Sequence, residues 1–245
     1  MRPHIEFIHA ESVPCQPLLL GSAGGNIRIL SHDQESGALT ALVHLPADWT
    51  LPIGRFTASV EFYLLTGTLI TEDYAASHHT YTFIPAGVRV GPMHTRSPVT
   101  LLWFTHGEAI FEPIDEDAPA SQRRLLINAL DTSALPWVNP ITPGFPPGAM
   151  RKQLRIDPDT GVSTWLLGVL PQWREPRIEI HPVAEEAFIL QGEMATHRGV
   201  MIAGSYFWRP PHVPHGPFHT DTGALILFRT DGHLQTFYRW PASSE

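Results

Sequence analysis

The hydrophobic and polar positions of this chain form short runs without helical spacing. Runs such as 40–46, 61–70 and 99–107 are rich in β-branched and aromatic residues and are bounded by glycine or proline. Such runs are typical of strands, and turn signals at regular spacing favour a β-sandwich or barrel over a parallel α/β sheet. We find no helical periodicity longer than about two turns. The pattern therefore predicts an all-β chain.

The same pattern occurs twice along the chain. A shift of 125 residues aligns 43–107 with 168–232 without a gap. Within this match, "YTFIPAGVRVGPMHT" (81–95) and "YFWRPPHVPHGPFHT" (206–220) share seven of fifteen residues. Chance turn chemistry does not produce an ungapped match of this length, so the repeat indicates a duplication.

The duplication predicts two domains, an N-terminal one over 1–121 and a C-terminal one over 122–245. The stretch 112–122 is polar and contains proline, as expected of a linker. The following stretch, "RRLLINAL" (123–130), is either a short helix or the first strand of copy two.

Composition narrows the class of protein. The chain has 245 residues, of which 43% are hydrophobic, so it is large enough to bury a core. Its formal net charge of −8 disfavours a nucleic-acid partner, which needs clustered Lys and Arg. The single Cys15 excludes an intrachain disulfide. Because no long apolar run and no signal-peptide pattern is present, we expect a cytoplasmic protein that does not associate with membranes.

The stretch "RIEIHPVAEEAFILQGEM" (177–194) carries the candidate chemistry. Strand side chains alternate between faces, so Glu179 and His181 share one face. Glu185 follows after a turn, and His215 comes about 30 residues later in the sequence. Two imidazoles and one or two carboxylates from neighbouring strands form a workable ligand set for a divalent transition metal.

These residues also resemble a known family. The spacing His-x3-Glu-x6-Gly that begins at His181 resembles the first cupin motif, and Gly-x5-Pro-x-His-x2-His from Gly204 resembles the second. The segments 157–161 and 209–218 are most similar to the ChrR-like cupins and related bicupins. The resemblance implies two tandem double-stranded β-helix barrels of the jelly-roll (cupin) type.

The resemblance also implies a ligand set. Cupins supply His-x-His, a glutamate and a later histidine to their metal. By that pattern His181, Glu185 and His215 are ligands, and Glu179 stands where the family has its first histidine. This departure either gives a harder ligand field or weakens binding. The harder field favours Fe(II), with Mn(II) and Zn(II) as alternatives.

Copy one lacks these residues. Gly54, Phe56, Val60 and Val90 occupy the corresponding positions. We therefore expect metal only in copy two. Copy one is expected to be structural, with its barrel filled by side chains.

Three further residues are candidates for a role near the site. His212 replaces a glycine (Gly87 in copy one) and is either an acid/base group or an exposed loop histidine. His219 is a candidate substrate contact, although its counterpart His94 persists in copy one and favours a structural role. Arg177 either holds an anionic substrate or is solvated.

Other polar and aromatic residues are interpreted as structural. Glu186 has an acidic counterpart, Glu61, in the copy without ligands, so it is not expected to bind metal. A core or interface role, not a substrate platform, is expected for the aromatic residues Trp165, Phe188, Phe207 and Trp208.

The function that follows is a metal-dependent bicupin enzyme. The resemblance favours an Fe(II)-type dioxygenase, an oxidoreductase that acts on a small diketone, hydroxyketone or phenolic substrate. The alternatives are a non-catalytic metal- or ligand-binding cupin of the sensor type, or a Mn or Zn isomerase, decarboxylase or hydrolase. Exposed β edges also favour a homodimer.

Overall fold

The computed structural model describes residues 2–114, 124–140 and 144–241. The linker expected over 112–122 therefore lies mostly outside the described residues. Two compact units make up the chain: unit 1 comprises Met1–Arg2 and Val13–Ala134, and unit 2 comprises Pro3–Ser12 and Leu135–Glu245.

Unit 1 contains only strands among its described residues. They are β2 (Gln16–Pro17), β3 (Asn26–His32), β4 (Leu39–Leu45), β5 (Thr50–Leu51), β6 (Gly54–Phe56), β7 (Val60–Thr66), β8 (Leu69–Thr71), β9 (Ala75–Ala76), β10 (Thr80–Ile84), β11 (Met93–Thr95), β12 (Val99–Thr105), β13 (Phe111–Pro113) and β14 (Ile127–Asp131). The main sheet has the order β14-β10-β7-β12-β4-β3-β2, and smaller sheets β5-β11-β8-β9 and β13-β6 accompany it.

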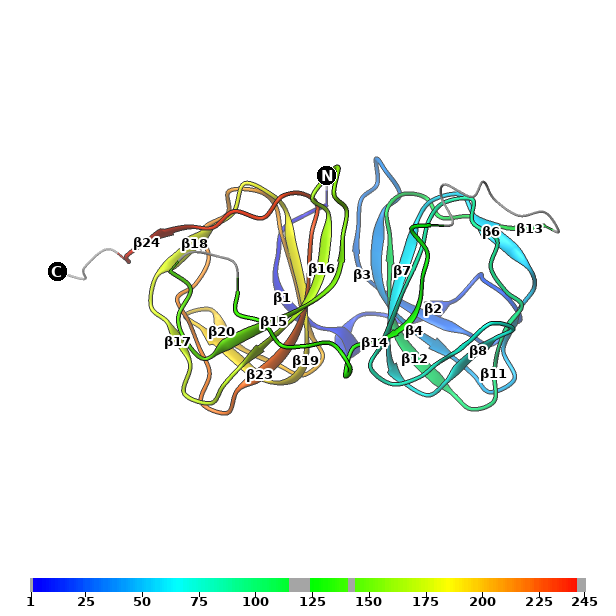
Figure 1. Ribbon diagram of the computed structural model, residues 1–245, viewed down its shortest axis with the longest axis horizontal. Helices are drawn as coiled ribbons and strands as arrows, with labels where there is room; N and C mark the ends of the chain where they lie inside the picture. The colour runs from blue at the N-terminus through cyan, green and yellow to red at the C-terminus, as the bar shows by residue number, and fades with distance from the viewer. Residues whose placement is uncertain (1, 115–123, 141–143, 242–245) are drawn as a thin grey trace. The chain divides into compact units, whose positions relative to one another are not determined.

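Unit 2 contains strands and one 3-10 turn, η1 (Ala10–Ser12). Its strands are β1 (Ile5–His9), β15 (Ala149–Ile156), β16 (Ser163–Val169), β17 (Arg174–Glu175), β18 (Ile178–Ile180), β19 (Glu185–Thr196), β20 (Gly199–Ile202), β21 (Ser205–Arg209), β22 (Phe218–His219), β23 (Ala224–Thr230) and β24 (Phe237–Arg239). The main path is β1-β21-β19-β23-β16-β15, with β17, β20 and β22 attached and β18 paired with β24 (Figure 1).

The predicted all-β class is confirmed, and the strands follow the sequence repeat. β10 and β21 differ by 125 residues at both ends, as do β12 and β23. A buried Glu–Tyr hydrogen bond also recurs at this offset: Tyr81 donates to Glu61 at 2.5 Å, and Tyr206 donates to Glu186 at 2.7 Å. The repeated pattern thus encodes the same local packing in each unit.

The division of the chain differs from the expected boundary between 121 and 122. β14 pairs with β10 of unit 1, so the described part of the stretch, 124–130, contributes a strand to the first unit and contains no helix. β1, dark blue in Figure 1, pairs with β21 of unit 2. β1 and β14 thus occupy the same sheet position in the two units. β1 precedes copy one in the sequence but belongs to unit 2, and β14 precedes copy two but belongs to unit 1.

The main sheet and the smaller strands of each unit enclose an apolar core. In unit 2 this core includes Trp165, Ile189, Phe207 and Ile226, each less than 5% exposed. Burial of these side chains supplies the main driving force for folding of the unit. No helix within the described residues is long and apolar enough to cross a membrane.

Candidate metal centre

The backbone of unit 2 brings the predicted ligands to one point. Glu179 lies in β18, and its peptide group exchanges two hydrogen bonds with that of His215, at 2.8 and 3.0 Å. His181 follows directly after β18, and the peptide N–H of His212 holds its carbonyl at 2.7 Å. Glu185 begins β19, opposite Arg209 of β21. Backbone hydrogen bonds between neighbouring segments therefore fix the positions of all four predicted ligands.

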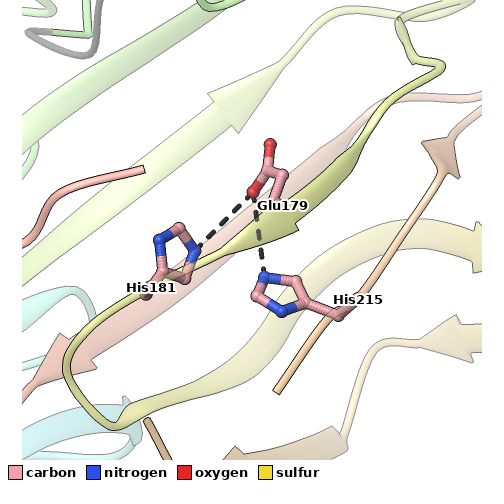
Figure 2. A group of neighbouring side chains, drawn as sticks. All are labelled: Glu179, His181 and His215. Atoms are coloured by element: carbon pink, nitrogen blue, oxygen red, sulfur yellow. Dashed lines mark ion pairs between the residues drawn. The ribbon is translucent and has the colours of Figure 1, made fainter. Parts of the chain in front are cut away.

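The four predicted ligand side chains converge. Nε2 of His181 lies 3.8 Å from the Glu179 carboxylate and 3.6 Å from that of Glu185. Nε2 of His215 lies 3.9 and 3.7 Å from the same two carboxylates. One oxygen of Glu179 faces both imidazoles, as Figure 2 shows. All four side chains are buried, with 4 to 9% of their surface exposed.

The imidazole tautomers fit a metal. Nδ1 of His181 is 3.0 Å from the carbonyl of Gln235, and Nδ1 of His215 is 2.9 Å from that of Val213. A carbonyl only accepts, so each Nδ1 carries a proton, and it is Nε2 that presents the lone pair when the imidazole is neutral. Both Nε2 atoms are buried and without a hydrogen-bond partner among the described residues. Lone pairs and carboxylate oxygens therefore face one another, an arrangement that a cation stabilises.

The spacing of these atoms also suits one ion. Ligand atoms at about 2.0–2.2 Å from a transition metal lie roughly 3 to 3.6 Å apart. The observed separations of 3.6 to 3.9 Å need only a small inward movement to reach that range. Glu179, His181 and His215 satisfy the geometry of a three-ligand metal site by themselves.

Burial changes the protonation of two of these groups. The pKa of Glu179 is raised from 4.5 to about 8, first by burial and then by the nearby charge of Glu185. The pKa of His215 is lowered well below 6.5, by burial and then by the positive charge of Arg209. His215 is therefore neutral near pH 7, as a ligand must be, whereas Glu179 must lose a proton before it binds metal.

A cavity of about 80 Å³ opens beside the cluster within unit 2. Its polar wall consists of the four predicted ligands, Arg151, Arg209 and Thr236. Most of the remaining wall is apolar or aromatic. This wall includes Trp165, Leu167, Trp173, Ile189, Phe207 and Phe228. The arrangement provides room for a small molecule next to the metal-type side chains.

Sequence reasoning missed the two arginines of this wall. Arg209 is 2% exposed, and its Nη1 lies 3.8 Å from the Glu185 carboxylate. Arg151 is 8% exposed, and its guanidinium lies 4.1 Å from the centre of the Trp165 ring. The repeat contained the signal, because the position equivalent to Arg209 in copy one is the apolar Ile84.

The comparisons agree with this fold. The family described as "Domain of unknown function (DUF4437)" matches residues 13–237. The chain belongs to the DUF4437 family. A search of curated proteins finds no match.

Solved structures resemble this DUF4437 chain over most of its length. A protein from Nostoc punctiforme described as a "putative dioxygenase" is 30% identical, covers 97% of this chain and 87% of its own, and has a TM-score of 0.89. A mutant oxalate decarboxylase from Bacillus subtilis is 10% identical, covers 96% of this chain and 80% of its own, and has a TM-score of 0.61. Protein Ylba from E. coli is 14% identical, covers 91% of this chain and 89% of its own, and has a TM-score of 0.66. The predicted cupin-type jelly-roll fold is confirmed.

The other predicted site residues of the DUF4437 chain lie outside the cavity wall. Arg177 binds Glu175 through Nε at 2.8 Å and Nη2 at 2.7 Å, and its guanidinium lies 3.7 Å from the Tyr238 ring centre. His219 is exposed on β22. His212 is exposed and has a φ of 66°, a backbone conformation that favours glycine. That backbone conformation accounts for the glycine at the equivalent position of copy one.

The core role predicted for the four aromatic residues is confirmed, since all four are buried. Trp165 and Phe207 are buried in the core, as expected, but they also line the cavity. Glu186 accepts hydrogen bonds from Tyr206 and Arg229, and does not line the cavity.

Unit 1 has the same backbone arrangement without the ligands. Gly54 and Val90 form the bridge that Glu179 and His215 form in unit 2. Phe56 stands in the position of His181 and packs against Trp103, with ring centres 5.5 Å apart. Phe56, Val60 and Val90 are buried in the hydrophobic core of unit 1, and a hollow lined mainly by apolar residues adjoins Phe56.

Proposed function

We propose that this protein is a metal-dependent enzyme whose centre is formed by Glu179, His181, Glu185 and His215. One observation carries the proposal: the buried Nε2 atoms of two imidazoles and two carboxyl groups face one point, 3.6 to 3.9 Å apart, and neither Nε2 has a hydrogen-bond partner among the described residues. The oxygen-rich donor set favours Fe(II), with Mn(II) next and Zn(II) third.

The reaction we propose is dioxygenation of a small diketone, hydroxyketone or phenolic substrate. The likeness to the Nostoc punctiforme protein supports this choice, since it extends over 97% of the chain. In such a reaction a carbon–carbon bond of the substrate breaks and both atoms of O2 enter the products, so no external reductant is needed. The metal supplies the Lewis acidity and redox chemistry that allow O2 to react with an enolate or phenolate.

The residues of the chain have defined tasks in this proposal. The carbonyls of Gln235 and Val213 fix the two imidazoles in the tautomer that binds metal. The apolar part of the cavity wall excludes water from the substrate. Glu179, which holds a proton up to about pH 8 in the metal-free protein, releases it when an ion binds.

We also propose that the chain is a bicupin related to the ChrR-like cupins, with a structural unit 1 and a metal-binding unit 2. The matching strands and the two equivalent Glu–Tyr hydrogen bonds support a duplication. A cytoplasmic homodimer acting on a small molecule, without nucleic acid or membrane, remains our proposal for its setting.

The first test is the metal content of the purified, untagged protein after anaerobic reconstitution with Fe(II) or Mn(II). We expect about one ion per chain, lost in His215→Ala and retained in His197→Ala, a control that removes an exposed histidine. Oxygen uptake with acetylacetone, 2-hydroxyacetophenone and catechol then tests the reaction class. Metal binding without oxygen uptake on any of the three would favour the non-catalytic cupin instead.

A further inference from the structure

Arg209 is a buried cation without a hydrogen-bonded anion. Its side chain is 2% exposed, and its Nε and Nη1 atoms are buried without a hydrogen-bond partner among the described residues. The nearest carboxylate oxygens belong to Glu185, 3.8 Å from Nη1, and Glu6, 3.9 Å from Nη2. Both separations exceed hydrogen-bond length. Burial without such a partner is costly, so the guanidinium is suited to an acceptor that enters the cavity.

A second buried arginine lines the same cavity. Arg151 is 8% exposed, and its Nε is also without a hydrogen-bond partner among the described residues. Its Nη2 donates to Gln153 at 2.6 Å and to Ser163 at 3.2 Å. These partners are neutral, so the positive charge of Arg151 is not balanced by them.

The charges of the cavity do not cancel when an ion is bound. A divalent ion balances the ionised carboxylates of Glu179 and Glu185. An imidazole that binds an ion through Nε2 keeps its proton on Nδ1, the atom beside its carbonyl partner, and adds no charge. The guanidinium groups of Arg151 and Arg209 then leave an excess positive charge in a low-dielectric cavity. Glu6 is 39% exposed, so water screens its effect. An anionic substrate would restore the balance.

Aromatic rings separate the two arginines. The guanidinium of Arg209 lies 3.7 Å from the Phe207 ring centre, and that of Arg151 lies 4.1 Å from the Trp165 ring centre. Phe228 lies between these rings, 6.1 Å from Phe207 and 5.5 Å from Trp165 between ring centres. The three rings form an apolar surface that ends in a cation on each side.

We propose that the substrate carries a carboxylate, which Arg209 binds beside the metal site while the apolar part of the substrate lies against the rings. This inference rests on the proposed function and narrows it to diketones, hydroxyketones or phenols that bear a carboxylate. Arg209 is thus assigned as a substrate-binding residue, and neither the half-buried Arg177 nor the exposed His219 is needed for that role.

The test compares a carboxylate with its neutral amide. Binding of 4-fluorobenzoate and 4-fluorobenzamide is measured by 19F NMR, with fluoroacetate and fluoroacetamide as a smaller pair. We expect the carboxylate of at least one pair to bind about 10- to 100-fold more tightly than its amide, as expected for charge-assisted hydrogen bonds. Arg209→Met should remove this preference, whereas Arg198→Met, which removes an exposed arginine, should retain it. Equal binding of carboxylate and amide, no carboxylate binding, or unchanged binding by Arg209→Met would overturn the proposal.

A second measurement does not depend on folding of the variant. The side-chain Nε–H signal of Arg209 in the wild-type protein, assigned with Arg209→Lys, should shift when the bound carboxylate is added and not when its amide is added. If the Arg209 signal does not shift when the carboxylate is added, the proposed role of Arg209 is refuted, even if Arg209→Met fails to fold.

The outcomes separate this inference from the proposed function. The titrations are run with metal-free protein and with protein loaded with Mn(II). Metal uptake without a carboxylate preference would retain the metal centre and reject the role of Arg209. A carboxylate preference that requires Arg209, without metal uptake, would retain the anion site and reject the metalloenzyme.

Discussion

Metal affinity should depend steeply on pH because Glu179 must lose a proton to bind. Its pKa in the metal-free protein is about 8, raised by burial and by the charge of Glu185. Below that pH, protons compete with the metal, and the apparent affinity falls by about tenfold per pH unit. Relative to full ionisation, affinity is weakened by about 2-fold at pH 8, about 10-fold at pH 7 and about 100-fold at pH 6. The loss at pH 7 corresponds to about 1.4 kcal/mol.

The other ligands do not all add to this dependence. The pKa of His215 is already well below 6.5, so this imidazole is neutral across the range and takes up no competing proton. The assay is titration with Mn(II) at several pH values between about 6 and 9, with free Mn(II) detected by electron paramagnetic resonance. Release of about one proton per ion at pH 7, measured by calorimetry in buffers of different ionisation enthalpy, is the companion result.

Glu179→Gln provides the decisive comparison. The amide does not titrate, so the variant should bind Mn(II) more weakly than the wild type at pH 9. Between pH 6 and 8, the slope of the logarithm of its Mn(II) affinity against pH should be smaller by about one. Glu72→Gln, which removes an exposed carboxylate of unit 1, should keep the wild-type slope. An unchanged slope in Glu179→Gln would refute the reasoning, because another group would then carry the competing proton.

Three further results are expected. In the metal-free protein the free energy of unfolding should fall as pH rises from about 4.5 to 8, by up to about 5 kcal/mol, because unfolded Glu179 releases a proton that the folded state retains; urea denaturation with and without Mn(II) checks this. Tyr206→Phe should lower the free energy of unfolding by about 1–2 kcal/mol without changing metal content, because Glu186 loses a buried donor; Tyr81→Phe is the matched variant in unit 1. His212→Gly should raise the free energy of unfolding by about 0.5–1 kcal/mol, because glycine tolerates the φ of 66°, and a lower melting temperature would contradict this.

The sequence was sufficient to predict the strands and the cluster of Glu and His side chains in unit 2. Strand burial depends on local alternation, which is visible in a single sequence. The repeat then served as an internal reference. Val60 and Val90 stand at the positions of Glu185 and His215, which therefore have no polar counterpart in copy one. In unit 2 the imidazoles of the predicted set lie 3.6 to 3.9 Å from its carboxylates.

The sequence was insufficient where the result depends on pairing between distant segments. The exchange of β1 and β14 relative to the tandem boundary follows from edge pairing with β21 and β10, which leaves no local signal. In the sequence Arg209 has the pattern of an ordinary arginine at a strand end. Only the pairing of β21 with β19 places it opposite Glu185. Trp165 has the pattern of a core residue, and only the structure shows that it also lines the cavity.

The two units together indicate that the fold does not require the polar cluster. Gly54 and Val90 form the same two-way backbone bridge as Glu179 and His215, with hydrogen bonds of 2.8 and 3.0 Å in each case. The backbone geometry is therefore satisfied by a glycine and an apolar side chain. Two carboxylates and two imidazole lone pairs in a buried site destabilise the folded protein unless a cation balances them. Because unit 1 shows that the architecture forms without these groups, binding of an ion is the physical reason we assign to their presence in unit 2.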